Sequence, residues 1–342
     1  MNPNQSVIRY SGGHQVGHCV RIKNDKHIFS NFGAGTLRGL PTIWNAKTCD
    51  PVGFIREYKD IVDYAPRIWV NPMCPVTTPF DKVANVIDEL TKKESHGSIG
   101  VGFGATIQRE ADNYHLYFCD LRYYEILRSK LDKIEEYYAE KKIFVNHEDI
   151  VQFLHDWEEM FRFASINKPG WVHEIWESSQ GLMLDMDYGI FPNVTRSRVG
   201  TQEITYLPEF DEIYLVTRAY QTRHGNGYCS KHVFKPSAKD ETNLNNEFQG
   251  EFKTRLLDID LINYAMNIDE GIRNHLNKNL VITCLDHMNK YAITIGGQIV
   301  DFKTENEFIE FIIKNIPPIE KVFLSHGPTA EDITLFKPET IV

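Results

Sequence analysis

The chain has 342 residues, of which 42% are hydrophobic and 25% are charged, and its formal net charge is −10. That acidic balance excludes a general nucleic-acid coat, because phosphate contacts need surplus Lys and Arg, although a locally positive pocket can still bind a small anion. No stretch approaches the roughly 20 apolar residues of a membrane span, and the six cysteines form no CxxC pair. We therefore expect a cytoplasmic protein that binds neither nucleic acid nor membrane.

The first half of the chain is predicted to hold one clear strand and three helices. Residues 7–10 form a short apolar strand that runs directly into glycines. Apolar residues at helical spacing predict helices over 81–93, 123–142 and 146–161, with another short strand at 142–145. Asp81 would cap the first helix, whose buried stripe would consist of Val83, Val86, Ile87 and Leu90.

The second half alternates short strands with one clear helix. Strands are predicted at 171–177, 212–217, 280–284 and 321–324, with an amphipathic helix at 305–316 and a long polar loop at 221–246. Such alternation predicts an α/β fold with a mostly parallel central sheet flanked by helices. We expect a single domain over residues 1–342 that carries a helical insertion at about 81–164.

Two glycine-rich segments are candidate ligand sites. In residues 12–18 (GGHQVGH), the glycines argue against a helix and favour a turn that brings backbone amides close to a ligand. A histidine on such a turn can donate a hydrogen bond or a proton, whereas the alternative is a tight turn with one structural histidine. Residues 97–104 (GSIGVGFG) expose amides that suit a phosphate, and the alternative is a flexible surface loop.

Four polar segments follow predicted strands, where ligands of open parallel sheets bind. They are residues 177–195, 222–227, 283–286 and 325–328. Gln180, in the first, offers a donor and an acceptor that suit a purine edge, and Asp286, in the third, can accept two hydrogen bonds from a guanine edge. Taken singly, each segment is also typical of a plain turn at the end of a strand.

The order of these segments resembles that of the adenylosuccinate synthetase family. Residues 7–18 (VIRYSGGHQVGH) are similar to the family's RY-x-GGHNAGH motif, and 177–195 to its EGAQG-x-LLDxDxGTYPYVT run. Residues 219–227 are similar to the AYxTRVGxGP turn, 283–286 to TKLD, and 325–328 to STGP. The fold implied is the P-loop-NTPase-like fold of that family.

The resemblance implies a purine-nucleotide ligase. A 6-oxopurine nucleotide, normally IMP, would be phosphorylated on O6 by GTP with Mg²⁺, and the amino group of aspartate would displace the phosphate to give adenylosuccinate. Phosphorylation turns a poor leaving group into a good one, and fixed donors and a metal must meet the charge that develops. Family members are homodimers, so the resemblance implies a homodimer.

The site residues implied by the resemblance fall into four groups. His18 would be catalytic and hydrogen-bond the purine O6, and Gly17 would offer its backbone carbonyl to Mg²⁺. The substrate nucleotide would be bound by Gln15, Ser98, Gln180, Thr195 and Gly227. Lys253 and Arg255 would bind the amino acid, and GTP would be bound by Asp286, Ser325 and Gly327.

The chain also departs from the family pattern. Family members begin with a strand, a GDEGKGK-type glycine loop and a helix, whereas here the motif residues Arg9 and Tyr10 follow Met1 closely. We therefore expect a fold that lacks the first strand and phosphate loop, through a start placed too far downstream, a truncation or a loss of catalysis. Gln249 to Asp258 holds two cations where the family has an arginine run, and Cys284 replaces the TKLD lysine. Arg109 stands near the family's cross-subunit arginine.

These departures leave alternatives to an active IMP ligase. One is a nucleotide-binding homologue with impaired catalysis, and another is a structural or regulatory subunit. A third is a phage-type variant that uses a different purine nucleotide, such as a 2-aminopurine or dGMP-like one, or ATP in place of GTP.

Overall fold

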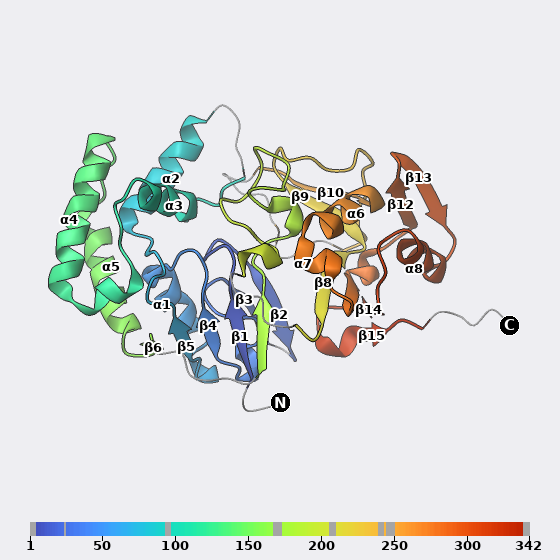
Figure 1. The fold of residues 1–342 in the computed structure, drawn as a ribbon, viewed down its shortest axis with the longest axis horizontal. Coiled ribbons are helices and arrows are strands. Elements are labelled where there is room, and N and C mark those ends of the chain that lie inside the picture. Colours follow the sequence, from blue (N-terminus) through green and yellow to red (C-terminus); the bar gives the residue numbers. More distant parts are fainter. Residues whose placement is uncertain are drawn as a thin grey trace. The chain divides into compact units, whose positions relative to one another are not determined.

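A computed structural model describes residues 5–23, 25–92, 97–166, 173–204, 210–238, 243 and 250–337. The chain divides into two compact units. Unit 1 comprises Met1–Val20 and Lys26–Glu203, and unit 2 comprises Arg21–Asp25 and Ile204–Val342. In Figure 1 the sequence colours of unit 1 run from blue to green, and most of unit 2 is yellow to red. The single-domain expectation stays a prediction.

Unit 1 is built on a five-stranded sheet in the order β6-β5-β4-β1-β7. Every pairing in it is parallel, and the interior strand β1 buries Val7 and Ile8 almost completely. Parallel sheets are usually covered on both faces, which is why their strands read as continuous apolar runs. The strands are β1 (Gln5–Arg9), β4 (Thr42–Trp44), β5 (Ile68–Val70), β6 (Ala164–Ser165) and β7 (His173–Glu177). β2 (His18–Ile22) and β3 (Asp25–Phe29) form a separate two-stranded sheet.

Five α-helices accompany the described strands of unit 1. They are α1 (Pro51–Asp60), α2 (Pro79–Thr91), α3 (Phe103–Ala111), α4 (Tyr124–Glu140) and α5 (His147–Met160). Helices α2 to α5 lie in or close to the expected helical region, and Figure 1 shows α4 and α5 at one end of unit 1. The predicted helices 123–142 and 146–161 are thus confirmed, whereas 142–145 is not a strand: Lys142 has a φ of 59° and turns the chain.

Helix α2 differs from its prediction in both its cap and its buried face. The cap is Thr78, which forms a capping box with Asp81 at the third helical position, and Pro79 opens the helix. Ile87 and Leu90 of the expected apolar stripe are 39% and 64% exposed. The buried face instead includes several polar residues, namely Asp81, Asn85 and Glu89.

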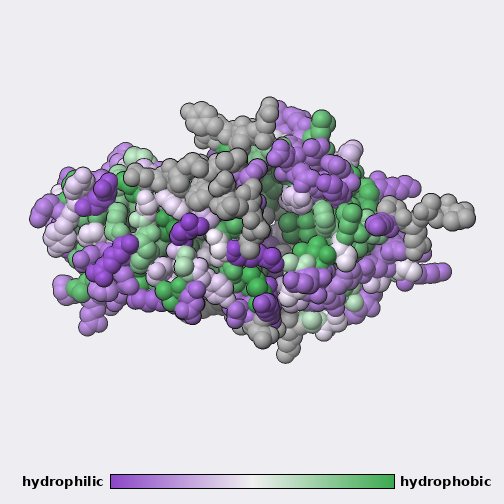
Figure 2. Space-filling model, turned by 90° about the horizontal axis from the view of Figure 1, so that it is seen from below, coloured by the Kyte–Doolittle hydropathy of each residue, from purple (hydrophilic) through white to green (hydrophobic). Residues whose placement is uncertain are grey.

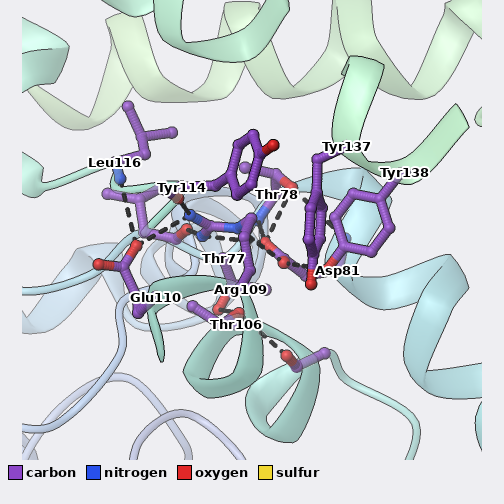
Figure 3. A network of polar contacts seen from close by, with 12 residues as sticks. Thr77, Thr78, Asp81, Thr106, Arg109, Glu110, Tyr114, Leu116, Tyr137 and Tyr138 are labelled. Carbon is purple, nitrogen blue, oxygen red and sulfur yellow. Dashed lines mark hydrogen bonds and ion pairs between the residues drawn. The ribbon is translucent and has the colours of Figure 1, made fainter. Parts of the chain in front are cut away.

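A buried ion pair explains why this face is polar (Figure 3). Arg109 of α3 donates from Nε to Asp81 Oδ1 at 2.9 Å and from Nη2 to the Val76 carbonyl at 2.8 Å. Tyr138 of α4 donates to the same Asp81 oxygen at 2.7 Å. Both charged side chains are 0% exposed. Arg109 therefore binds groups of its own chain, which corrects its placement as a cross-subunit arginine.

Unit 2 contains two four-stranded sheets. The first has the order β15-β14-β11-β8, in which the β8–β11 and β11–β14 pairings are parallel and the edge strand β15 is antiparallel. The second has the order β13-β12-β10-β9 and only its β10–β12 pairing is parallel. The strands are β8 (Ile213–Arg218), β9 (Tyr220–His224), β10 (Phe252–Asp258), β11 (Lys278–Thr283), β12 (Tyr291–Ile295), β13 (Gln298–Phe302), β14 (Lys321–Ser325) and β15 (Ile333–Leu335).

Three helices complete the described part of unit 2, and a shared core joins them to the strands. They are α6 (Ile259–Ile268), α7 (Glu270–Asn274) and α8 (Glu305–Lys314). Phe308, Ile309 and Ile312 of α8 are fully buried in one cluster with Leu280 and Ile282 of β11. The predicted strands 212–217, 280–284 and 321–324 and the helix 305–316 are confirmed, as is the mostly parallel α/β architecture.

The expected long loop 221–246 begins as a strand instead. Residues 220–224 form β9, because their antiparallel pairing with β10 outweighs the low strand preference of their polar side chains. Part of the rest of the expected loop lies outside the described residues. Short 3-10 turns occur at Thr36–Arg38, Val62–Tyr64, Phe118–Arg122, Leu182–Leu184, Thr201–Glu203, Leu285–His287 and Ala330–Asp332. On the face shown in Figure 2, hydrophilic residues surround smaller hydrophobic areas.

Candidate active site

The glycine turn after β1 brings two distant motifs of unit 1 together. Gly12 has a φ of +59°, and its amide donates to Ser197 Oγ at 3.0 Å. A Cβ at Gly12 would lie 2.6 Å from Gln180 Oε1 and 2.9 Å from Ser179 Cβ. Glycine is therefore required here both for its backbone conformation and for the close approach of Gln180.

The first histidine of the turn is structural. His14 is 5% exposed; its Nε2 lies 3.0 Å from the Val101 carbonyl and its Nδ1 3.3 Å from Thr48 Oγ1. A carbonyl only accepts, so Nε2 donates, and in the neutral ring Nδ1 then accepts from the Thr48 hydroxyl. Burial lowers the pKa of His14 below its ordinary value of 6.5, although the Asp50 carboxylate acts in the opposite direction. His14 thus fastens the glycine turn to the glycine loop 97–104.

We expect His14 to make the stability of the protein fall as the pH falls. Because its folded pKa lies below the unfolded value of 6.5, the unfolded chain binds the extra proton first, so the stabilisation is present above pH 6.5 and is lost below it. His14→Gln, which keeps a donor for Val101, should reduce the pH dependence of the free energy of unfolding, measured by urea denaturation at about pH 7.5 and about pH 5.5. His155→Gln, at a side chain that is 66% exposed, is the control. An unchanged pH dependence in His14→Gln would contradict this role.

His18 is the second histidine of the turn and opens β2. Its side chain is 26% exposed, its Nδ1 forms a short hydrogen bond with Glu177 Oε1, and its Nε2 lies 3.2 Å from the Ser179 carbonyl. Glu177 closes β7, and sequence analysis assigned it no role. The pairing of β1 with β7 places both the turn and Glu177 at the carboxyl edge of the sheet, where ligands of open α/β sheets bind.

Three residues expected to bind the substrate nucleotide lie near this turn. Gln15 Nε2 donates to Thr195 Oγ1 at 3.4 Å, and Thr195 is held by a backbone hydrogen bond to Leu184 at 2.8 Å. In the described part of the chain, the Oε1 atoms of Gln15 and Gln180 are buried without a hydrogen-bond partner. A buried acceptor without a partner costs free energy, so both amides are suited to N–H donors of a ligand.

The glycine loop 97–104 is anchored rather than loose. Ser98 Oγ accepts from Asn85 Nδ2 at 3.0 Å and from the Gly100 amide at 3.2 Å, and the Gly102 amide donates to Asn85 Oδ1 at 3.0 Å. Ser98 is linked to the glycine turn through the same loop, by way of Val101 and His14. Two of the loop's amides thus bind protein groups, which leaves fewer of them for a phosphate than the bare sequence predicts.

Unit 2 presents a cationic sheet face. Lys253 pairs with Arg223 and Arg255 with Gln221 across β9 and β10, so these four side chains share one face. The Arg223 guanidinium occupies the space above Gly227, where a Cβ would lie 1.8 Å from its nearest atom. Burial lowers the pKa of Arg223. Lys253 Nζ donates to the Gly225 carbonyl at 2.8 Å, and this bond links the turn at residues 225–227 to β10.

The sequence alone does not single out Arg223, because its place beside Lys253 and Arg255 depends on strand pairing. The sequence marks it only as part of a basic glycine turn, about 30 residues before Lys253. The antiparallel register is what brings three cations together.

The residues expected to bind GTP lie on neighbouring parallel strands of unit 2. Asp286 follows β11 and Ser325 closes β14, and the parallel register of these strands places both at the carboxyl edge of the sheet. Asp286 Oδ2 lies 3.6 Å from His287 Nε2, and Ser325 Oγ donates to the Gly327 carbonyl at 2.9 Å. A Cβ at Gly327 would lie 2.5 Å from the Asp332 carboxylate, so glycine is needed there.

A carbonyl ligand for Mg²⁺ is available at Gly17, which is exposed just before β2. Mg²⁺ prefers oxygen ligands and usually takes one or two carboxylates together with substrate phosphates and water. Among the described residues, the group of close His, Asp and Glu side chains that could hold a metal is His155, Asp156 and Glu159 of α5, which does not include Gly17. At Gly17, phosphate oxygens and water would therefore have to supply most of the ligands.

The adenylosuccinate synthetase family model matches residues 2–322, so the chain belongs to the adenylosuccinate synthetase family. Members of this family are carbon–nitrogen ligases. The chain is 24% identical to the adenylosuccinate synthetase of Buchnera aphidicola subsp. Baizongia pistaciae, over 96% of this chain and 84% of the relative. It is 26% identical to that of Ectopseudomonas mendocina, over 67% of this chain and 59% of the relative.

Two solved structures share the fold. The fully ligated adenylosuccinate synthetase of Plasmodium falciparum matches with a TM-score of 0.75 and 15% identity, over 97% of this chain and 94% of that one. The succinoaminodeoxyadenylate synthetase of cyanophage S-2L, bound to dGMP and dATP, matches with a TM-score of 0.61 and 14% identity, over 96% of this chain and 87% of that one. In the described part of the protein, no helix has the length and apolar character needed to cross a membrane.

Proposed function

We propose that this protein is a purine-nucleotide ligase that joins aspartate to IMP, or to a related 6-oxopurine nucleotide, in a GTP-dependent reaction that forms adenylosuccinate. The observation that carries the proposal is the arrangement of His18, whose partly exposed ring contacts Glu177 and the Ser179 carbonyl, next to the segment whose Gln180 packs on Gly12 of the glycine turn. Family membership and the clustering of the expected nucleotide-binding residues support the same reaction.

His18 is proposed to act on the purine O6. Among the described residues, its Nε2 contacts the Ser179 carbonyl at 3.2 Å, a long contact that a substrate oxygen can replace. A hydrogen bond from Nε2 stabilises negative charge on O6 as that oxygen attacks the γ-phosphoryl group, and again as the phosphate leaves. Gln15, Gln180 and Thr195 are proposed to orient the base and its phosphate, together with Ser98 and Gly227.

The cationic face of unit 2 is proposed to bind the amino acid. Lys253 and Arg255, with Arg223 as a third cation, provide positive charge for the two carboxylates of aspartate. Asp286 is proposed to read the guanine of GTP, with Ser325 and Gly327 beside it. Mg²⁺, when bound, would supply Lewis-acid stabilisation of the phosphoryl oxygens, with Gly17 as its protein ligand.

We also propose that the protein is cytoplasmic and forms a homodimer, in keeping with its family. Light scattering after size exclusion should then give about twice the chain mass of 39.6 kDa. Recovery of the monomer alone at micromolar concentration would contradict the dimer.

A second candidate is a phage-type ligase that acts on a 2-amino-6-oxopurine nucleotide or uses ATP. The buried Oε1 atoms of Gln15 and Gln180 are the observation that favours it, because a 2-amino group offers the N–H donors that IMP lacks at this position. The structural relative from cyanophage S-2L is described with dGMP and dATP bound. Cys284, which replaces a lysine of the family pattern, gives further reason to test ATP.

Turnover assays separate these functions. The full chain is incubated with Mg²⁺, aspartate, one of IMP or dGMP, and one of GTP or ATP, and the succinylated nucleotide is detected by chromatography and mass spectrometry. Product from IMP and GTP supports the first proposal, and product only from dGMP or with ATP supports the second. Calorimetric binding of a nucleotide with no product in any combination would overturn both ligase proposals in favour of a nucleotide-binding homologue.

A further inference from the structure

We infer that Glu177 is a positioning residue that sets the orientation of the His18 ring by accepting a hydrogen bond from its Nδ1. This inference rests on the proposed function for its consequence, since His18 is there the group that acts on O6. Glu177 itself has no contact with substrate in this role and acts only through His18.

The Glu177 carboxylate is fixed through both of its oxygens. Oε1 forms the short hydrogen bond with His18 Nδ1, and Oε2 accepts the Ala34 amide at 2.9 Å. Its side chain is 16% exposed. Two bonded oxygens leave the carboxylate one orientation, and a carboxylate held in this way fixes the ring that donates to it.

Arg9 keeps this carboxylate ionised. Its guanidinium is 0% exposed and lies 3.9 Å from Glu177, and it donates to the Phe32 carbonyl at 2.9 Å and to Ser179 Oγ at 3.2 Å. Burial by itself would raise the pKa of Glu177, but the hydrogen bond from His18 and the Arg9 charge more than offset it, so that the pKa lies below the usual value. Glu177 is therefore an acceptor only, and His18 Nδ1 must donate.

The second ring nitrogen also faces an acceptor. His18 Nε2 lies 3.2 Å from the Ser179 carbonyl, so both ring nitrogens lie against fixed groups at the end of β7. Glu177 on Nδ1 thus fixes which ring nitrogen is left for the substrate oxygen, namely Nε2. His14 in the same turn differs, because Thr48 gives its Nδ1 a donor.

Glu57 provides a matched comparison within unit 1. It is also a buried glutamate beside a histidine, since its Oε1 lies 3.6 Å from His27 Nε2. Its Oε2, however, accepts the backbone amides of Ser30 and Asn31 at 3.0 and 2.7 Å, so its main contacts hold a loop. A structural role predicts the same consequences for both glutamates, whereas the positioning role predicts different ones.

The test compares Glu177→Gln, Glu177→Asp and Glu57→Gln in the full-length protein. Glu177→Gln should lower kcat by about 10²-fold or more with KM for the nucleotide changed little, since an amide in place of the carboxylate permits the wrong ring tautomer. Glu177→Asp should restore part of kcat. Glu57→Gln should lower Tm but leave kcat within about 3-fold of the parent.

A second readout does not depend on turnover. Nitrogen NMR of protein labelled with ¹⁵N-histidine, with the His18 signals assigned by their loss in His18→Asn, should show a hydrogen-bonded Nδ1–H in the parent that is shifted or lost in Glu177→Gln. An unchanged His18 signal in Glu177→Gln would overturn the inference, as would equal losses of kcat in Glu177→Gln and Glu57→Gln. A parent without ligase activity would sink the proposed function, and the NMR result would still decide the inference about the ring.

Discussion

Replacement of His18 by asparagine is expected to lower kcat of the proposed ligase reaction by about 10²–10⁴-fold, the usual contribution of a positioned acid–base group. Asparagine fills part of the same space but cannot present a ring N–H, held in place by Glu177, to a developing oxyanion. Because the side chain is 26% exposed and stands beside the sheet, we expect little change in stability. Steady-state kinetics with saturating nucleotides, together with thermal unfolding, measure the two effects.

His27→Asn is the matched control, since His27 also lies in the hairpin of β2 and β3 and also faces a buried glutamate. Its kcat should stay within about 3-fold of the parent. Equal kcat values for His18→Asn and the parent would remove His18 from the mechanism, even if the protein proves to be a ligase.

Replacement of Arg109 by methionine is expected to lower the free energy of unfolding by about 3–5 kcal/mol, because it leaves the Asp81 charge buried without its partner. Asp81 is 0% exposed and, in the part of the chain that the structure describes, would keep its hydrogen bonds from Tyr138 and from Thr78, the helix cap (Figure 3). The Val76 carbonyl would lose a donor in the same variant. Urea denaturation measures the change.

Arg128→Met is the control for this variant, because Arg128 pairs with Asp132 within α4 at 40% and 59% exposure. Exposed pairs of this spacing contribute about 0.5 kcal/mol or less, so the control should be close to the parent. A double variant, Asp81→Asn with Arg109→Met, should recover part of the loss because it removes the unpaired charge. A loss below about 1 kcal/mol in Arg109→Met would show that water reaches Asp81 and that the pair is not buried in solution.

Helices were predictable where burial follows apolar periodicity. Leu127, Leu131 and Ile134 of α4 are buried as their spacing predicts. The same rule failed in α2, because Arg109 makes the polar face of that helix the buried one. No periodicity within α2 reveals a charge supplied by α3, so only tertiary contacts decide which face is covered.

Strands of apolar residues in the parallel sheets could be predicted from the sequence. A polar strand that exists because of its hydrogen bonds to a neighbouring strand could not. β11 and β14 read as strands from their β-branched and aromatic residues. β9 is polar, and its existence depends on its hydrogen bonds to β10. A hairpin between segments separated by a long connection leaves no local signal of this kind in the sequence.

By itself, the sequence determined the family, the alternation of strands and helices, and the motifs from which His18, Gln180, Thr195 and Asp286 were chosen. These are local properties, because a motif is a short run of residues and periodicity is a pattern within one element. The tertiary structure decided that His14 is the structural histidine of the glycine turn, and that His18 is hydrogen-bonded to Glu177, which in turn lies beside Arg9. It also decided that Arg223 lies on the same sheet face as Lys253 and Arg255. Each of these is set by strand register or burial, which depend on residues far apart in the chain.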